Sequence, residues 1–269
     1  MIVEFLNRMG IWKIEPVLFF AGCLFFVVAM SMLVIKKYFK IQVSKTFTVV
    51  YSWADVLWSS FLMGFVIISF VVQIFKIPSS SMENTLKVGD YLFVNKFIYG
   101  VGSPFVDNGK RYMPWRCVKA GDIVVFQCPP EALKSNERER GVKKDFVKRC
   151  VAVGGDKVEI KDKKLYVNDT YVEEPYVIFE DYNIFHDSLN NDNFRSHYQK
   201  AWENYRFVHR DCVRDNFGPV IVPKGHYMMM GDNRDGSFDS RFWGPLPDKY
   251  VKGKVLFLYW PLKRCGKVK

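Results

Sequence analysis

Three consecutive serines, Ser79 to Ser81, follow Pro78 and precede Met82. A serine hydroxyl is a weak nucleophile and needs a neighbouring base to remove its proton. The four histidines are scattered along the chain, which does not favour a Ser-His-Asp triad. The best candidate base is Lys148, so the sequence points to serine-lysine chemistry, in which a neutral amine activates a hydroxyl.

Lys148 accepts a proton only when its amine is neutral, so its ordinary pKa of about 10.4 must be lowered by removal from water. In a strand, Phe146, Lys148 and Cys150 share one face, and we expect Lys148 to point inward while Arg149 points outward. The alternative is that Lys148 is one more surface lysine of a basic segment. The serines likewise fit an ordinary polar loop, so the residue types alone leave both interpretations open.

Two long uncharged runs precede the serines. Residues 17–35 would form about 28 Å of helix, close to the thickness of the hydrocarbon layer. Residues 56–75 are less apolar but also lack charge. We predict a transmembrane helix in each run. The alternatives are a cleavable secretory signal for the first run, and a buried core helix or a re-entrant hairpin for the second.

The connection between these runs, residues 36–55, is basic, and the positive-inside rule therefore places it in the cytoplasm. Its lysines are Lys36, Lys37, Lys40 and Lys45. Residues 1–75 are then a membrane anchor. Residues 76–269 form an extracytoplasmic domain that is large enough to bury its own core.

Short apolar segments bounded by turn residues follow the serines. They are Tyr91–Lys96, Ile123–Phe126, Lys157–Ile160, Lys164–Val167 and Val251–Trp260. The third and fourth predict a hairpin across Asp162-Lys163. We therefore expect a mainly β fold: an antiparallel β-sheet domain with an inserted smaller subdomain at about residues 171–217, anchored by two N-terminal transmembrane helices. The aromatic side chains of the insertion fit a small local core or a binding platform.

The net charge of +11 does not point to nucleic acid, because the basic residues are spread along the chain. Residues 131–149 and 263–269 are strongly basic, and both contact with anionic headgroups and solvated surface charge remain open for them. Of the six cysteines, Cys23 lies in the first predicted span, which leaves an odd number outside that cannot all pair within the domain. No His or Cys spacing is typical of a metal site.

Four sequence blocks, in this order, resemble those of the bacterial type I signal peptidases, the leader peptidases of the serine-lysine dyad family. They are Ser79–Leu86, which reads Ser-Ser-Ser-Met-Glu-Asn-Thr-Leu, then Gly121–Phe126, then Lys148-Arg149 through Gly155-Asp156, and finally Gly231–Arg241, which contains Gly-Asp-Asn and Asp-Ser-Arg. Together with the two predicted spans, the blocks cover nearly the whole chain. Asn84 stands where the family usually has proline.

The resemblance implies that Ser81 attacks the scissile carbonyl while Lys148 removes its proton, and that Lys148 then activates the water that hydrolyses the acyl-enzyme. It assigns the oxyanion hole to the backbone N–H of Ser81 and the hydroxyl of Ser79. Ser237 would orient the lysine. Asp239 and Arg241, the remaining matched residues, would hold the site together. A tight turn and an ordinary structural ion pair are the alternative interpretations of this last block.

The resemblance further implies a membrane-bound serine endopeptidase that cleaves N-terminal signal peptides from exported preproteins, with small residues before the cut. Such a protein would be a multi-pass protein of the bacterial inner membrane. Its catalytic domain would lie on the periplasmic side, in contact with the lipid bilayer. It would need no cofactor and no metal, and it would bind no nucleic acid.

Two other functions remain open at this point. One is a membrane-tethered binding or scaffold module that keeps the fold without catalysis. The other is a related serine-lysine peptidase that cleaves itself or a regulatory protein. Acylation of Ser81 by an inhibitor would separate an enzyme from a scaffold, and the identity of the cleaved substrate would separate the two peptidases.

Overall fold

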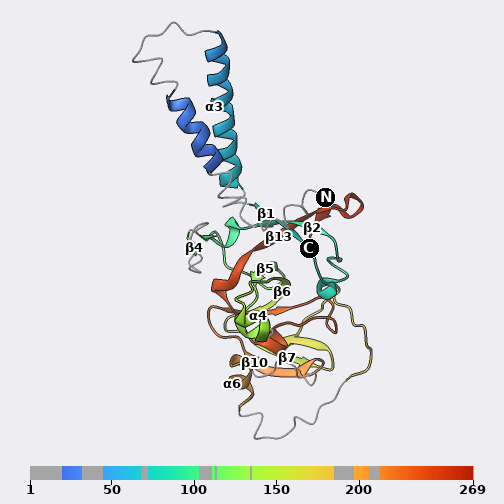
Figure 1. The fold of residues 1–269 in the computed structure, drawn as a ribbon. Helices are drawn as coiled ribbons and strands as arrows, with labels where there is room; N and C mark the ends of the chain where they lie inside the picture. Colours follow the sequence, from blue (N-terminus) through green and yellow to red (C-terminus); the bar gives the residue numbers. More distant parts are fainter. Residues whose placement is uncertain are drawn as a thin grey trace. The chain divides into compact units, whose positions relative to one another are not determined.

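The computed structural model describes residues 20–31, 45–67, 72–102, 111–112, 114–133, 135–184, 197–205 and 213–268. The chain divides into two compact units, with the main boundary between Gln73 and Ile74. Figure 1 shows the helices of the first unit and the sheets of the second. Each unit is described by itself.

The first unit contains two packed helical segments. Residues 20–31 are helical, and helix α3 spans Lys45–Val66. Phe25 stacks on Phe61 with ring centroids 5.7 Å apart, and Phe26 meets Trp58 edge to face at 5.2 Å. Within the described residues, no helix combines the length and the hydropathy that crossing a bilayer requires. The rest of the first predicted span lies outside the described residues.

The predicted second span, residues 56–75, has neither the start nor the end of the observed helix. Helix α3 already begins at Lys45, so the last part of the predicted loop is helical, whereas residues 36–44 lie outside the described residues. Val72–Lys76 form strand β1 instead of the end of a helix. β-Branched Val72 and Ile74 favour a strand, and β1 gains backbone pairing by joining β2 in the large sheet.

The second unit contains an eight-stranded sheet in the order β1-β2-β13-β5-β6-β11-β12, with β14 paired to β13. Its further strands are β2 (Tyr91–Asn95), β5 (Ile123–Gln127), β6 (Asp145–Val153), β11 (His226–Met230), β12 (Leu246–Pro247), β13 (Val251–Trp260) and β14 (Gly266–Lys267). The pairings from β2 to β12 are antiparallel. This confirms the prediction of a mainly β, antiparallel domain.

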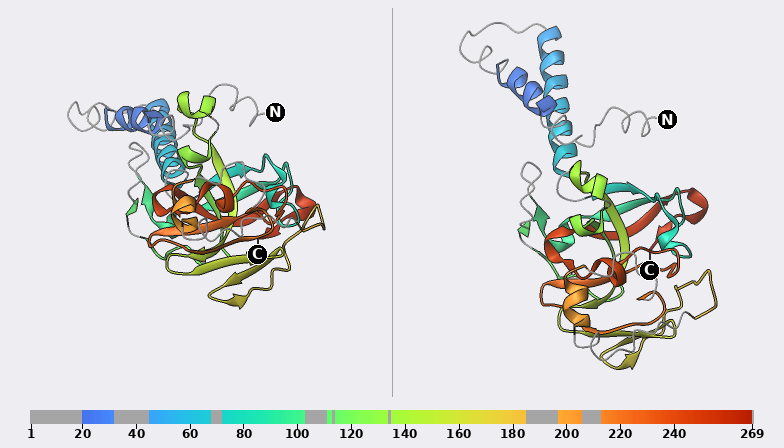
Figure 2. Two further views of the ribbon diagram at one scale, coloured as in Figure 1. Left: turned by 90° about the horizontal axis from the view of Figure 1, so that it is seen from below. Right: turned by 60° about the horizontal axis from the view of Figure 1, so that its bottom comes forward.

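A smaller sheet has the strand order β10-β7-β8-β9. In the sequence, its strands come between β6 and β11 of the large sheet. Its strands are β7 (Lys157–Lys161), β8 (Lys164–Val167), β9 (Thr170–Tyr171) and β10 (Phe217–Ile221). The predicted hairpin across Asp162-Lys163 is confirmed, and both turn residues have positive φ, as a tight turn of this kind requires. The chain leaves the large sheet after Val153 and returns at His226, so the predicted insertion at 171–217 falls within this excursion. Figure 2 shows the β7–β9 strands, in yellow-green, at one end of the unit.

Short elements connect these strands. They are the 3₁₀ turns η2 (Ser80–Met82), η3 (Phe97–Tyr99), η4 (Pro130–Ala132), η6 (Asp248–Tyr250) and η7 (Leu262–Arg264), the helices α4 (Ser135–Glu139), α6 (Tyr198–Glu203) and α7 (Ser240–Trp243), and a two-stranded pair of β3 (Val101–Gly102) and β4 (Arg111–Tyr112). Trp202 of α6 is fully buried and packs against Phe217. This contact supports the interpretation of the aromatic residues as a local core.

Apolar side chains cover the large sheet on both faces at β5. Ile123 and Val125 enter one cluster, which also holds Met82, whereas Val124 and Phe126 enter another. A continuous apolar run is what a strand buried on both faces requires. The neighbouring strand β6 is buried from Lys148 to Ala152, so a polar side chain in that part of it needs a partner inside the protein.

Candidate active site

The serine loop is held by its own backbone and by one apolar anchor. Met82 is buried in the core beneath the loop, and the amide of Leu86 donates to its carbonyl at 2.7 Å. The carbonyl of Ser81 accepts from the amide of Asn233 at 3.2 Å. The hydroxyl oxygens of Ser79 and Ser81 lie 3.4 Å apart. The loop thus presents two neighbouring hydroxyls on a fixed backbone.

Asn84 replaces the usual proline with a different constraint. Its φ of 84° lies in the left-handed region, which asparagine tolerates and which the ring of proline excludes. Its side-chain amide donates to the carbonyl of Tyr176 at 3.0 Å. The loop is therefore tied to another segment by a hydrogen bond.

Lys148 lies on β6 opposite Val124 of β5, and only 4 % of it is exposed. Burial lowers its pKa from 10.5 to about 8, while Asp239 and Asp232 act in the opposite direction and Arg241 lowers it further. The interpretation of Lys148 as a surface lysine is therefore wrong. A buried amine with this pKa carries a sizeable neutral fraction near neutral pH, as a general base requires.

Arg149 does not point outward into solvent, contrary to our expectation, and is as buried as its neighbour. Its guanidinium forms two hydrogen bonds to Asp232, at 2.9 and 2.7 Å, and stacks on the ring of Tyr176 at 3.7 Å. The pattern of the strand correctly places Lys148 and Arg149 on opposite faces. It does not reveal that the Gly231–Arg241 loop and Tyr176 cover the second face. Sequence analysis missed Asp232 as a site residue, although it stands in the matched Gly-Asp-Asn block.

Gly231 joins the serine loop to Ser237. A Cβ atom added at Gly231 would overlap Ser237 Oγ and the Ser81 carbonyl, so only glycine allows the chain at this position to lie so close to both. Ser237 is buried, and its hydroxyl forms no hydrogen bond of normal geometry with the described residues. An unsatisfied buried hydroxyl is costly and is a feature of functional sites.

Asp239 and Arg241 form a buried pair at the base of the site. Arg241 donates to both carboxylate oxygens of Asp239 at 2.9 Å and to the carbonyls of Arg214 and Arg234 at 2.6 Å. Burial alone would raise the pKa of Asp239, but Arg241, then Lys148 and the nearby Ser237 hydroxyl, lower it below its ordinary value. The carboxylate stays ionised and also accepts from the amide of Gly231 at 3.2 Å.

The residues expected from the sequence thus belong to one polar centre within the second unit. Ser81 and Ser237 both approach Gly231, Ser79 lies beside Ser81, and the charges of Lys148, Asp239 and Arg241 act on one another. In the part of the chain that the structure describes, no group of three or more His, Cys, Asp or Glu is arranged to hold a metal ion.

One edge of β6 is open next to this centre. Residues Asp145–Lys148 pair with β5 on one side. On the other side, β11 pairs with Arg149–Val153, and within the described residues no strand pairs with Asp145–Lys148. Unpaired backbone groups at a strand edge accept an additional strand. The site therefore combines two neighbouring hydroxyls, a buried amine and a strand edge that is free on one side in the described residues.

Comparison with known proteins gives a consistent result. A family model described as "Signal peptidase, peptidase S26" matches residues 50–260. Signal peptidase I of Pseudomonas aeruginosa is 34% identical over 209 residues, covering 72% of this chain and 67% of that protein. Signal peptidase I of Haemophilus influenzae is 32% identical over 237 residues, covering 74% of this chain and 66% of that protein.

A shorter relative and a solved structure were also found. Signal peptidase IB of Staphylococcus aureus is 32% identical over 202 residues, which cover 75% of this chain and 85% of that protein. A crystal structure of a signal peptidase I from Enterococcus faecalis is 23% identical, with a TM-score of 0.31, and covers 52% of this chain and 97% of that one. The chain spans about two thirds of the length of the first two relatives.

Proposed function

The chain belongs to the signal peptidase family, peptidase S26, and from this we propose that Ser81 and Lys148 are the catalytic dyad of a serine endopeptidase. The observation that carries the proposal is the burial of Lys148, which gives an amine with a pKa of about 8. This chemistry needs no cofactor.

In the proposed reaction, the Ser81 hydroxyl attacks the scissile carbonyl and Lys148 accepts its proton. The tetrahedral oxyanion receives hydrogen bonds from the Ser81 amide and from the Ser79 hydroxyl, which lies 3.4 Å from Ser81 Oγ. Lys148 returns the proton to the leaving amine, which leaves an acyl-enzyme on Ser81. A water activated by Lys148 then releases the acyl group.

Ser237, Asp239 and Arg241 support the dyad in this proposal. The buried hydroxyl of Ser237 forms no hydrogen bond of normal geometry with the described residues. It would therefore be available for a hydrogen bond with the Lys148 amine. The Asp239–Arg241 pair fixes the loop that carries Ser237 and supplies the charges that act on Lys148.

Signal peptidase I acts on exported preproteins, and we propose that the cleaved segment here is a signal peptide with small residues before the cut. The substrate would lie extended along the open edge of β6 at Asp145–Lys148, where main-chain hydrogen bonds bind it irrespective of most side chains. Small side chains next to the cut would bring the scissile carbonyl close to Ser81.

We also propose a membrane location, with two N-terminal spans and the catalytic domain on the outer face of the inner membrane. Support comes from the end of β13 and the turn after it, where 51% of Trp260 and 71% of Leu262 are exposed. Lys263, which is also exposed, follows directly. Exposed apolar side chains beside basic ones are suited to the surface of an anionic bilayer.

Cleavage of a preprotein with an Ala-x-Ala site by the detergent-solubilised full chain tests the function. The unaltered chain should cut at the predicted bond, whereas Ser81→Ala should lose all measurable turnover and covalent labelling by an acylating inhibitor. Ser80→Ala is the matched control because it alters the adjacent hydroxyl, and it should cut normally. Ser79→Ala should lower kcat by about 100-fold or more, as loss of an oxyanion donor does.

The outcomes separate the alternatives. Labelled, active protein that cuts itself or a regulatory protein but not the preprotein would favour the related serine-lysine peptidase. A folded chain that neither cuts nor becomes labelled would favour the scaffold. Normal cleavage by Ser81→Ala would exclude Ser81 as the nucleophile.

Cleavage should depend on pH through Lys148. Only the neutral amine accepts the Ser81 proton, so kcat/KM should fall as the pH is lowered through the Lys148 pKa of about 8. The unfolded chain holds this proton up to its ordinary pKa of 10.5, so the contribution of Lys148 to the free energy of unfolding should rise between these values. A pH–rate profile with a peptide substrate checks this, and an acidic limb near pH 6 would indicate another base.

A further inference from the structure

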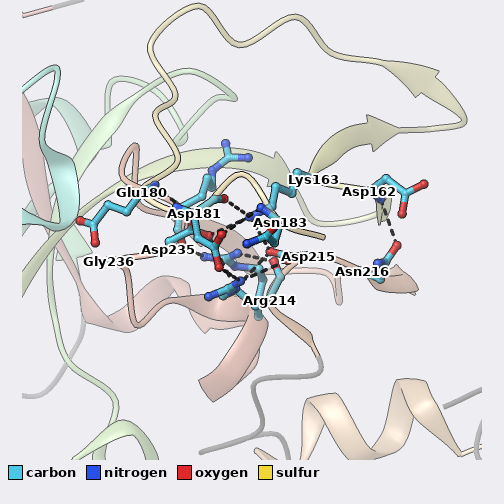
Figure 3. A network of polar contacts seen from close by, with 12 residues as sticks. Asp162, Lys163, Glu180, Asp181, Asn183, Arg214, Asp215, Asn216, Asp235 and Gly236 are labelled. Carbon is cyan, nitrogen blue, oxygen red and sulfur yellow. Dashed lines mark hydrogen bonds and ion pairs between the residues drawn. The ribbon is translucent and has the colours of Figure 1, made fainter. Parts of the chain in front are cut away.

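A second group of charged side chains lies where the Gly231–Arg241 loop meets the smaller sheet. Figure 3 shows Lys163, Arg214 and Asp215 converging on Asp235, with Asp181 beside them. Lys163 comes from the β7–β8 turn, whereas Asp235 belongs to the loop that also carries Ser237. The group therefore joins the smaller sheet to the proposed active site.

Asp235 makes contacts in three directions. One carboxylate oxygen accepts from the backbone amides of Glu180 and Asp181, both at 2.9 Å. The other lies 3.3 Å from the amine of Lys163 and 3.6 Å from Arg214 Nε. The side chain of Asp235 is almost completely buried, so water screens these contacts little. A single side chain thus fixes the loop to three other segments.

Lys163 has acidic partners on both sides. Its amine lies 3.2 Å from Asp215 as well as 3.3 Å from Asp235, and it donates to the carbonyl of Asp181 at 2.8 Å. Asp215 also pairs with Arg214 at 3.2 Å. Loss of Asp235 alone would leave both cations with the carboxylate of Asp215. Replacing Asp235 should therefore loosen the loop without leaving an unpaired buried charge.

The loop between the network and the site is short and tightly connected. Ser237 follows Asp235 by two residues, and the amide of the intervening Gly236 donates to the side chain of Asn233 at 3.1 Å. The backbone of Asn233 in turn donates to the carbonyl of Ser81. At the other end of the loop, Arg241 donates to the carbonyl of Arg214. Both ends of the segment that carries Ser237 and Asp239 are thus attached to the network.

We propose that Asp235 is a positioning residue for the serine-lysine reaction: by fixing the Gly231–Arg241 loop to the smaller sheet, it holds Ser237 and Asp239 against Lys148 and keeps water away from the amine. This inference rests on the proposed function. Asp235 touches neither the substrate nor the reacting atoms in this proposal, and it acts only through the loop.

The proposal predicts a particular change at Lys148. Burial is the largest influence on this amine, and the charged groups that act on it, Asp239, Arg241 and Asp232, all belong to this loop. A loosened loop would admit water and stabilise the ammonium form. The dyad would then need a higher pH to function, and its geometry would be less well defined.

The experiment compares the full chain with Asp235→Asn, which keeps the size and one acceptor oxygen but removes the charge. We expect kcat to fall about 10-fold or more with little change in KM, and the acidic limb of the kcat/KM profile to move to higher pH. Asp235→Ala, which also removes the acceptor for the amides of Glu180 and Asp181, should show a larger effect. Asp169→Asn is the control, because it removes an exposed ion pair with Lys157 on the same sheet and should leave all three quantities unchanged.

Thermal unfolding of each variant shows whether the protein is fully folded at the assay temperature. A lower Tm for Asp235→Asn with an unchanged pH profile and unchanged kcat in the folded protein would mean that Asp235 is structural only, and would overturn the proposal. Failure of the proposed function gives a different result, because Ser81→Ala or Lys148→Met would then cut as well as the unaltered chain.

Discussion

Replacing Lys148 by methionine should lower kcat/KM for preprotein cleavage by roughly ten-thousand-fold while the protein stays folded. Methionine has a similar length and no proton acceptor, so it fills the buried site on β6 without serving as a base. It also removes a buried amine, whose transfer from water is unfavourable. Asp239 keeps Arg241 as its partner, so the substitution leaves no unpaired carboxylate. Cleavage kinetics together with thermal unfolding measure the two effects.

Two further variants make this expectation specific. Lys148→Arg keeps a positive charge that cannot become neutral, so it should also be inactive. Lys164→Met is the control, because Lys164 is exposed on β8, and it should retain full activity. Substantial cleavage by either Lys148 variant would show that the base lies elsewhere.

Replacing Arg241 by methionine should lower the free energy of unfolding by about 3 to 5 kcal/mol, as loss of one partner of a buried ion pair does. Arg241 is almost fully buried, and its replacement removes the guanidinium that donates to the carboxylate of Asp239 and to the carbonyls of Arg214 and Arg234. The Asp239 charge then acts on Lys148 without the opposing charge of Arg241. The pKa of Lys148 should rise in consequence, and cleavage at neutral pH should fall steeply.

Urea unfolding measures the change in stability, and a second variant separates its causes. Removing both charges, in Asp239→Leu with Arg241→Met, should recover part of the lost stability because the Asp239 carboxylate is no longer buried without its guanidinium partner, but it should not recover cleavage. Lys157→Met, which breaks an exposed pair with Asp169, should change the free energy of unfolding little. A loss of stability for Arg241→Met no larger than that of this control would contradict the role of the pair.

The strands of the second unit followed from the sequence because their signals are local. Alternating and continuous apolar segments bounded by turn residues correctly indicated β5, the β7–β8 hairpin and β13. The pattern around Lys148 also gave the correct face of β6. The roles proposed for Ser81 and Lys148 came from the resemblance of the sequence blocks, since the residue types alone also fit a polar loop and a surface lysine.

The end of α3 and the start of β1 could not be predicted from the sequence. Residues 56–75 form one uncharged run, and hydropathy alone does not mark where α3 ends and β1 begins. The strand at Val72–Lys76 is stabilised by pairing with β2, which lies further along the chain. Backbone pairing with a distant partner is not encoded in the composition of the run itself.

Tertiary structure alone decided what surrounds the site. The strand period shows that Arg149 faces away from Lys148, but not that Asp232, 83 residues further along, buries it. In the same way, Asp235 and Lys163 are 72 residues apart and appear in the sequence as a turn acid and a surface lysine. The sequence therefore determined the strands and, through its resemblance, the groups that we propose to react. Only the folded chain determined which charges are buried together, because electrostatic interactions and the pKa of Lys148 depend on distances through space and on exclusion of water.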